Sequence, residues 1–321
     1  AFQTLNRIFV DTFGKELHVV HALFQYGFKD ILQHGFCKPG NIVQIAQADA
    51  RFSILAEAVV AADLATTLAG PGPFTVFAPT NDAFAALLTE LGLTKAQLLA
   101  DKPLLTAVLQ YHVLSGTVRK AAVPLGAAIS PLEGGIFKVD SVGADLVITD
   151  GRNRTSTIVV TDVAAANGVP HAVNTVRLPA DRNIVQTAVA SAPEFGILVE
   201  AVTAAGLVDT LSGPGPFTVF APTDAAFAAL LVELGVSKAQ LLADTALLDK
   251  VLKYHVLPGR VLKAGVPVGA PITTVQGETF SVNASLAITD QRGRTANIVA
   301  TDVLTSNGVI HVIDKVILPA P

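Results

Sequence analysis

The chain has 321 residues, of which 51% are hydrophobic and 15% are charged, and its formal net charge is -4. This composition is typical of a globular protein and excludes a largely disordered one. Without a basic excess to neutralise phosphates, nucleic acid is not an expected partner. At roughly 100–150 residues per domain, the length predicts two or three domains.

The first 40 residues stand apart from the rest of the sequence. They hold Cys37, the single cysteine, which excludes an intramolecular disulfide. Apolar residues recur there at helical spacing, namely Leu5, Ile8, Phe9, Phe13, Leu17, Val20 and Phe24. We expect residues 1–40 to form a helical N-terminal extension. It could pack on the neighbouring domain or dock on a partner, a membrane surface or a pigment, and it is a candidate for self-association.

Helical patterns come first in the segment that follows. A helix is predicted over about residues 52–62, and another follows Thr80, whose hydroxyl suits the N-cap position. A further helix is expected over about residues 103–110. The longest uncharged stretch, residues 64–81, contains three prolines, so we expect no transmembrane span of about 20 apolar residues.

Strand patterns dominate the second half of this unit. Apolar and β-branched runs occupy residues 146–149, 157–163 and 171–178, after an earlier short run at 74–77. A unit in which helices precede most of the strands is typical of an α+β fold.

The whole unit occurs twice. The segment Gly70–Thr80 recurs as Gly213–Thr223, Tyr111-His112 recurs as Tyr254-His255, and a closing Asn-Gly-Val block recurs in the same order. A period this long indicates a duplicated domain rather than a solenoid repeat of about 20–50 residues. We therefore predict an extension at residues 1–40, a first domain at 41–180 and a second at 181–321. The short linker predicts a nearly fixed arrangement of the two domains.

These blocks resemble the fasciclin-like (FAS1) family. Its first box is matched by Phe74–Phe84 and Phe217–Phe227, its Tyr-His box by both Tyr-His pairs, and its closing box by Thr301–Asp314. The resemblance implies two tandem FAS1 domains, each a β-wedge or sandwich flanked by helices. It also implies a non-catalytic adhesion or matrix-attachment role for a secreted, periplasmic or cell-surface protein that binds an extracellular protein or polysaccharide. Some relatives carry carotenoids, so a carrier of such an apolar molecule is the alternative.

The resemblance marks the Tyr-His pairs as candidate partner-binding residues. They are Tyr111, His112, Tyr254 and His255. The competing interpretation is structural, because an uncharged imidazole readily satisfies buried backbone groups where a helix passes into a strand.

Two further sets of residues are candidates for partner binding. Asp162 and Asp302 stand where animal relatives carry an Asp-Ile integrin-binding pair, although valine replaces isoleucine here. Two matched turns present paired arginines that could grip carboxylates or sulfates of a polysaccharide, namely Arg152, Arg154, Arg292 and Arg294. Each set also has a structural interpretation, as a strand end or as a turn whose arginine pairs with the adjacent Asp.

The sequence gives no support for catalysis. Motifs for a nucleophile elbow, a zinc protease, a P-loop or a complete dinucleotide fingerprint are absent. The histidines fall at matched positions without clustering, so neither a catalytic residue nor a metal site is predicted.

The two copies differ at the closing box. Pro170 stands where the second copy has Ile310, and Asn174 stands where it has Asp314. Because proline cannot donate a hydrogen bond to a neighbouring strand, Pro170 predicts an edge or a bulge. The second copy keeps the family pattern more closely and is therefore the predicted binding copy.

Overall fold

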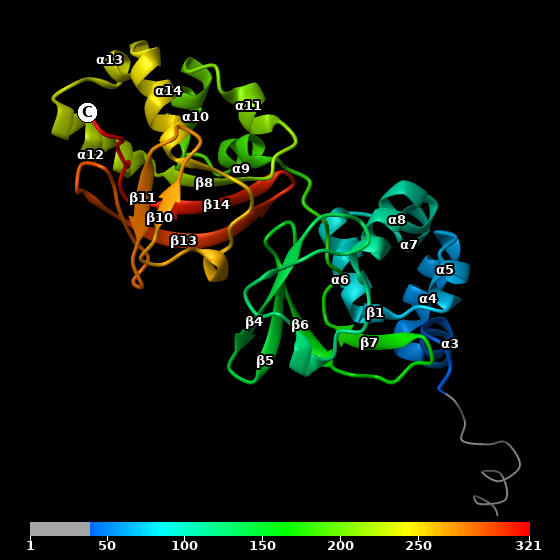
Figure 1. Ribbon diagram of the computed structural model, residues 1–321. Coiled ribbons are helices and arrows are strands. Elements are labelled where there is room, and N and C mark those ends of the chain that lie inside the picture. Colours follow the sequence, from blue (N-terminus) through cyan, green and yellow to red (C-terminus); the bar gives the residue numbers. More distant parts are fainter. Residues whose placement is uncertain (1–38) are drawn as a thin grey trace, which may run out of the picture.

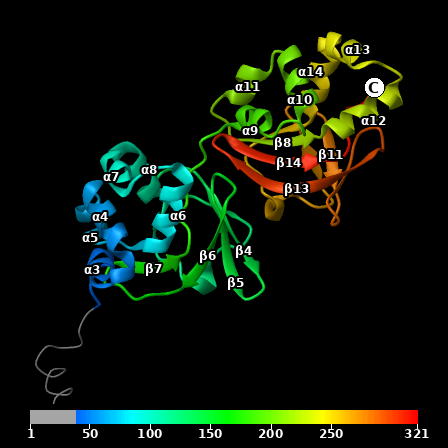
Figure 2. The ribbon, with the colours of Figure 1, turned by 180° about the vertical axis from the view of Figure 1, so that it is seen from behind.

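The computed structural model describes residues 39–321, which form two α+β domains of the same architecture (Figure 1). Seen from behind, the helices of each domain gather on one side of its curled sheet (Figure 2). The predicted tandem α+β domains are confirmed. The helical extension predicted at residues 1–40 lies outside the described residues except for its last two positions.

The helices of domain 1 are capped as the sequence predicts. Thr80 accepts a hydrogen bond from the backbone N–H of Ala83, and Gly92 ends the same helix in the left-handed region at φ 65°. The α-helices are α3 (Ile42–Ala48), α4 (Ser53–Ala61), α5 (Ala65–Ala69), α6 (Asn81–Leu91), α7 (Lys95–Ala100) and α8 (Lys102–Tyr111), and the 3-10 turns are η1 (Ala50–Phe52) and η2 (Lys120–Ala122).

The sheet of domain 1 has the order β2-β1-β7-β6-β5-β4-β3. Its strands are β1 (Phe74–Pro79), β2 (Val113–Ser115), β3 (Ala128–Ile129), β4 (Phe137–Val142), β5 (Asp145–Thr149), β6 (Thr155–Val160) and β7 (Gly168–Val173). Only the β1–β7 pair is parallel. A Cβ at Gly168 would lie 2.0 Å from the carbonyl oxygen of Phe74, so this close start of the parallel pair requires glycine.

The core of domain 1 lies on both faces of this sheet. One apolar cluster fills the space between the helices and β1, and Phe84 and Leu105 are fully buried in it. A second cluster fills the curl of the sheet around Phe77, Tyr111 and Phe137. Phe77 and Phe137 meet edge to face with ring centroids 5.5 Å apart, a favourable geometry for aromatic pairs.

Domain 2 repeats this plan. Its helices are α9 (Ile184–Ala190), α10 (Gly196–Ala204), α11 (Val208–Ser212), α12 (Asp224–Leu234), α13 (Lys238–Ala243) and α14 (Thr245–Tyr254), with the 3-10 turn η3 (Lys263–Gly265). Its strands are β8 (Phe217–Pro222), β9 (Val256–Pro258), β10 (Pro271–Thr273), β11 (Thr279–Val282), β12 (Ala287–Thr289), β13 (Thr295–Thr305) and β14 (Gly308–Ile313). The order β10-β11-β12-β13-β14-β8-β9 matches that of domain 1, and β8 and β14 form the parallel pair.

Pro170 accounts for a difference between the two sheets. In domain 2 the ladder between β13 and β14 continues through the pair Val303 and Ile310. In domain 1 the backbone N–H of Val163 still donates to the carbonyl oxygen of Pro170, but proline has no N–H to return the bond, and β6 ends at Val160. The β6–β7 pairing contains a bulge between Ile158 and Val160, but domain 2 has the same register shift between Ile298 and Ala300 without a proline, so Pro170 is not its cause. The predicted edge is wrong, because β7 lies between β1 and β6.

Candidate partner-binding site

The first Tyr-His pair lies inside domain 1, where its polar atoms bond to the backbone. The Tyr111 hydroxyl donates to the carbonyl oxygen of Ile136 at 2.5 Å. His112 Nδ1 lies 2.7 Å from the carbonyl oxygen of Val108, and His112 Nε2 accepts the backbone N–H of Arg177 at 3.0 Å. Both side chains are at most 1% exposed.

The second pair makes the same contacts in domain 2. Tyr254 donates to the carbonyl oxygen of Thr279 at 2.8 Å, and His255 joins the carbonyl oxygen of Val251 to the backbone N–H of Ile317. Each imidazole therefore ties the end of a helix to the segment after the last strand. These contacts match the structural interpretation of the Tyr-His pairs, whose side chains are buried within the two domains.

Burial makes the stability of domain 2 depend on the protonation of His255. Burial lowers the pKa of His255 to about 4, against about 6.5 in an unfolded chain. Between these pH values the unfolded chain binds more protons, so the free energy of unfolding falls as the pH drops from about 6.5 to about 4. The loss amounts to about 3 kcal/mol.

We expect this pH dependence to be smaller in a His255→Gln variant, which has no imidazole to protonate. Urea unfolding of domain 2 at pH 7 and at pH 4.5, followed for both proteins, measures the difference. Equal losses in the two proteins would contradict the assignment, because the carboxylates that also titrate in this range are common to both.

The paired arginines are mostly held within their own domains. Arg154 donates from Nε and Nη2 to Asp150 and from Nη1 to Glu90 at 2.7 Å. Arg294 contacts the equivalent carboxylates of Glu233 and Asp290 at 3.0 and 3.9 Å. These contacts match the structural interpretation, in which the arginine pairs with the Asp of its own turn.

The other arginine of each turn is less restrained. The guanidinium of Arg152 lies 3.2 Å from a carboxylate oxygen of Asp181, and Arg292 donates from Nε to the carbonyl oxygen of Pro319. Arg292 is the exposed member of the four. Neither turn therefore brings two free guanidinium groups together on the surface.

The two Asp-Val pairs share an unusual backbone conformation. Asp162 and Asp302 have φ values of 58° and 61°, a region that non-glycine residues seldom adopt. The histidine of the closing box fixes each turn, because Nδ1 of His171 accepts the N–H of Asp162, and Nδ1 of His311 accepts that of Asp302. The carboxylate then accepts the backbone N–H of Lys120 in domain 1 and of Lys263 in domain 2.

The surroundings of the two carboxylates differ because domain 1 covers only Asp302. Nζ of Lys138, on β4 of domain 1, donates to Oδ2 of Asp302 at 2.8 Å, and the carboxylate side chain is 2% exposed. Burial alone would lower the pKa of Lys138, but its hydrogen bonds to Asp302 and Asp140 outweigh that effect and raise it. The ammonium therefore stays charged and neutralises the buried carboxylate.

Asp162 keeps one carboxylate oxygen free of hydrogen bonds within residues 39–321 and is half-buried at the surface of domain 1. Beside it, Val163 lines an apolar hollow of about 100 Å³. Other residues around this hollow are Ile42, Phe52, Val76, Val160, Pro170 and Ala172. The sequence favoured the second copy as the binding copy, but the structure leaves Asp162 half-buried at the surface and buries Asp302.

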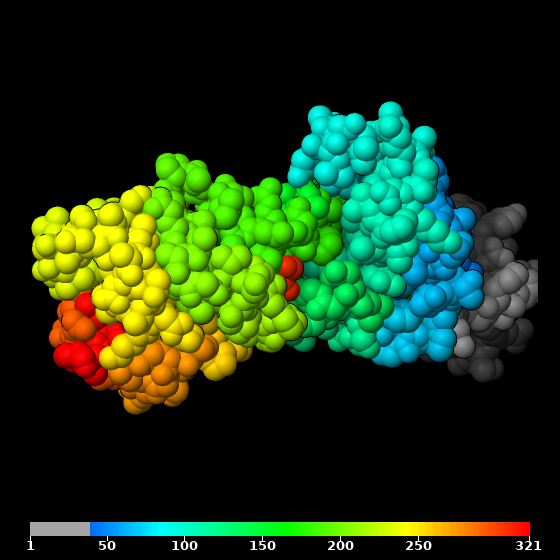
Figure 3. Space-filling model, turned by 90° about the horizontal axis from the view of Figure 1, so that it is seen from above, coloured from blue at the N-terminus to red at the C-terminus, as the bar shows by residue number. Residues whose placement is uncertain are grey.

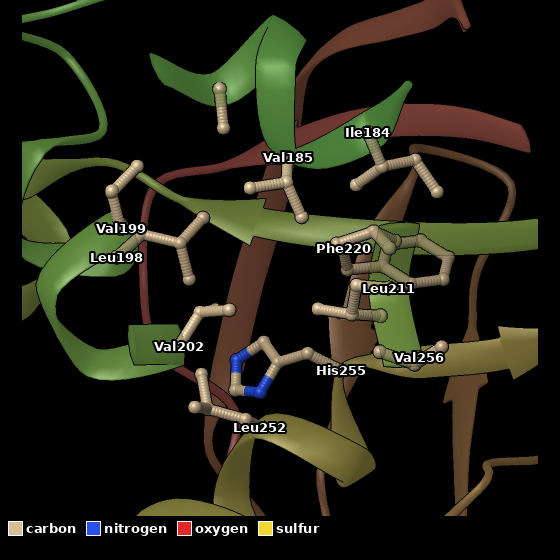
Figure 4. Close-up of a pocket in the computed structure, with 12 residues that line it drawn as sticks. Ile184, Val185, Leu198, Val199, Val202, Leu211, Phe220, Leu252, His255 and Val256 are labelled. Atoms are coloured by element: carbon tan, nitrogen blue, oxygen red, sulfur yellow. The ribbon is translucent and has the colours of Figure 1, made fainter. Parts of the chain in front are cut away.

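A second hollow lies between the helices and strands β8 and β9 of domain 2 (Figure 4). Its volume is about 30 Å³, close to the share of one water molecule in the liquid. Leu198, Val202 and Leu252 line it, and His255 is its main polar neighbour, with both ring nitrogens already bonded. Packing of the core explains this hollow.

Residues 39–321 contain no group of three or more His, Cys, Asp or Glu side chains placed to hold a metal ion. None of the helices in the same range is both long and apolar enough to cross a bilayer.

No local pattern in the sequence marked the residues that join the domains. Lys138, Asn153 and Ile136 belong to segments that look like ordinary strands and turns, and each meets a residue of the other domain that is more than 120 positions away. A comparison of the two copies position by position could have found them, because the equivalent residues differ.

Comparisons with known proteins agree with the two-domain architecture. The fasciclin domain family model matches residues 50–179 and 193–319. "Protein sll1483" of Synechocystis is 47% identical over 128 residues, which cover 39% of this chain and 67% of that protein. Transforming growth factor-beta-induced protein ig-h3 of Sus scrofa is 30% identical over 251 residues, which cover 78% of this chain but 35% of ig-h3.

Among solved structures, a FAS1 domain pair from the insect cell adhesion molecule fasciclin I aligns with 86% of this chain and 95% of its own, with a TM-score of 0.42 and 19% identity. The two family matches together span most of the sequence and coincide with the two repeated domains. The chain therefore belongs to the fasciclin domain family.

Proposed function

We propose that the protein is a non-catalytic adhesion or attachment protein that binds a protein partner through domain 1. Membership of the fasciclin family supports an adhesion role. Another relative is a cell surface glycolipoprotein of Mycobacterium bovis, 34% identical over 140 residues, which supports a secreted, periplasmic or cell-surface location.

The observation that carries the proposal is the contrast between Asp162 and Asp302. The two residues have the same backbone geometry, and a histidine supports each turn in the same way, but only the Asp302 carboxylate is paired with the ammonium group of Lys138. In this chain the Asp162 carboxylate is therefore the one that can accept a hydrogen bond from another molecule. We call Val160, Asp162, Val163 and the adjoining hollow the loop face.

The loop face favours a protein partner over a polysaccharide. Its hollow is lined almost entirely by apolar side chains and has room for a small apolar group, since a cavity of about 150 Å³ can hold a benzene ring. Val160 is 37% exposed at its rim. A partner that inserts an apolar side chain here and donates a hydrogen bond to Asp162 would combine an anchor with orientation.

The histidines support a non-catalytic role. Each of the four histidines in residues 39–321 has both ring nitrogens in hydrogen bonds with backbone groups. A general base must be able to reach a substrate proton, and these four side chains are too enclosed to do so.

The carotenoid alternative finds less support. Pockets for drug-sized ligands have volumes of about 300–1,000 Å³. The hollows of about 100 and 30 Å³ are far smaller, so neither could enclose a carotenoid. A visible absorption band in the purified full chain would nevertheless revive this alternative.

We expect the double variant Asp162→Ala, Val163→Ser to bind cells and extracellular proteins of the producing organism about tenfold or more weakly than the unchanged chain. Residues at the centre of an interface often contribute about 2 kcal/mol or more, and tenfold corresponds to about 1.4 kcal/mol. The effect is measured by coating one surface with the double variant and another with the unchanged chain, and by comparing how many cells and how much extracellular protein each surface retains. Asp162→Asn, which keeps an oxygen for the Lys120 N–H, separates the role of the charge from that of the turn.

The matched control is Val142→Ser, Asp145→Ala, because these residues are an exposed Val and Asp on the β4–β5 hairpin of the same domain. The control should bind like the unchanged chain. Undiminished binding by the Asp162, Val163 variant, with its melting temperature preserved, would rule out the loop face.

A further inference from the structure

The two domains meet through unlike surfaces. Domain 1 contributes Ile136, Lys138 and Asn153, which we call the donor face. Domain 2 contributes the acceptor face, which consists of Leu262, Asp302, Leu304 and Val309. The molecule is elongated, and its two domains are in contact end to end (Figure 3).

Three kinds of interaction hold these faces together. The Lys138–Asp302 ion pair is almost fully removed from water. Asn153 accepts the backbone N–H of Leu304 at 2.6 Å and donates to its carbonyl oxygen at 3.0 Å, as a neighbouring strand would. Ile136 completes an apolar cluster with residues of the acceptor face, and all of its members are at most 5% exposed.

Domain 2 lacks the residues of a donor face. At the positions of Ile136, Lys138 and Asn153 it has Thr279, Ser281 and Gly293, respectively. The equivalence is structural, because the buried tyrosine of each domain donates to the carbonyl oxygen of Ile136 in one and of Thr279 in the other. Domain 2 therefore lacks the cation, the side-chain amide and the large apolar group together.

Domain 1 lacks the apolar residues of an acceptor face. Arg119 and Ala164 replace Leu262 and Leu304, and both are exposed. Asp162 remains, but the cation of Arg119 now stands where the acceptor face has a leucine. A donor face with a lysine would meet the positive charge of Arg119 there, and it would find little apolar surface to bury.

We infer that this contact is one-way and self-limiting: domain 1 is the dedicated occupant of the acceptor face of domain 2, and the chain does not repeat the contact with other copies of itself. A head-to-tail interface whose two faces both remain available generates rings or open filaments. Because domain 2 lacks a donor face and domain 1 lacks an acceptor face, this contact cannot generate rings or filaments. The inference is independent of the proposed function.

Two full-chain variants restore one face each. The first, Thr279→Ile, Ser281→Lys, Gly293→Asn, places a donor face on domain 2. Asparagine is tolerated at Gly293, whose φ of 71° is close to the 62° of Asn153. The second, Arg119→Leu, Ala164→Leu, places an acceptor face on domain 1.

We expect a mixture of the two variants to form a 1:1 complex that neither forms alone, because each carries only one restored face. Combining all five substitutions should give chains whose mass increases with concentration. Sedimentation up to about millimolar protein measures this, since a short linker holds the natural faces at about that effective concentration. Replacing Ser281→Lys by Ser281→Glu in the first variant should abolish the complex.

The inference is overturned if the mixture sediments as separate chains although both variants melt like the unchanged protein. It is also overturned if the unchanged chain itself associates and Ser281→Glu disperses it. A second measurement does not depend on restored faces: Ile136→Thr, Lys138→Ser, Asn153→Gly should broaden the distance distribution between labels placed on the two domains. An unchanged narrow distribution would show that these residues do not hold the pair.

Discussion

Replacing Asn167 by alanine is expected to lower the free energy of unfolding of domain 1 by about 3–5 kcal/mol. Asn167 accepts the backbone N–H of Ile42 at 3.0 Å and donates to the carbonyl oxygens of Leu68 and Gly70, both at 2.8 Å. The side chain is 7% exposed, so water could not replace these bonds without entering the core. One residue thus joins the starts of α3 and β7 to the end of α5.

Domain 2 offers an internal replicate of this experiment. Asn307 bonds in the same way to Ile184, Leu211 and Gly213, so Asn307→Ala should destabilise domain 2 and leave domain 1 intact. Calorimetry combined with hydrogen exchange assigns each loss to its domain. Asn174→Ala is the control, because this exposed side chain accepts one backbone bond, from Thr157, and should cost about 1 kcal/mol. Equal costs at the buried and exposed asparagines would refute the explanation.

Replacing Arg177 by isoleucine is expected to stabilise domain 1 by about 1–4 kcal/mol. The guanidinium is fully buried between the rings of Phe77 and Phe137, 4.2 and 4.1 Å from their centroids. Its nitrogens have no hydrogen-bond partner within residues 39–321. Burial lowers the pKa of Arg177 to about 9, so the group still carries its charge at neutral pH. Cation–π contacts of about 2 kcal/mol each offset only part of the desolvation of such an ion.

The choice of isoleucine comes from the protein itself, because Ile317 occupies the equivalent place in domain 2. The reverse change, Ile317→Arg, should therefore destabilise domain 2 by about 3–5 kcal/mol, the usual cost of an uncompensated buried charge. Unfolding in urea at pH 7 measures both. A loss of stability in Arg177→Ile would mean that contacts with the aromatic rings outweigh desolvation.

The fold could be predicted from local patterns. Thr80 and Gly92 bound a helix whose apolar face repeats every three to four residues, and both copies carry the same signals. The parallel partner of β1 could not be predicted in this way, because the pairing places Phe74 opposite Gly168, 94 residues further along the chain. No short-range pattern specifies such a pairing.

The candidate site was harder to predict, since exposure depends on the neighbouring domain. Asp162 and Asp302 share the same Thr-Asp-Val sequence, and only Asp302 is covered by Lys138 of the other domain. The Tyr-His pairs illustrate the converse. The family resemblance suggested recognition, but both side chains are buried beside the sheet, where backbone groups take up their hydrogen-bonding capacity.

The parallel pairing of the first and last strands sets the order in which each domain can be completed. β1 lies between β2 and β7, so its final neighbour is made only after the chain has reached residue 173. Such long-range pairing slows folding relative to local hairpins. During synthesis on the ribosome, one edge of β1 therefore stays unpaired until the last strand emerges. Any truncation that removes β7 or β14 leaves that edge unpaired, and the fragment would be prone to aggregate.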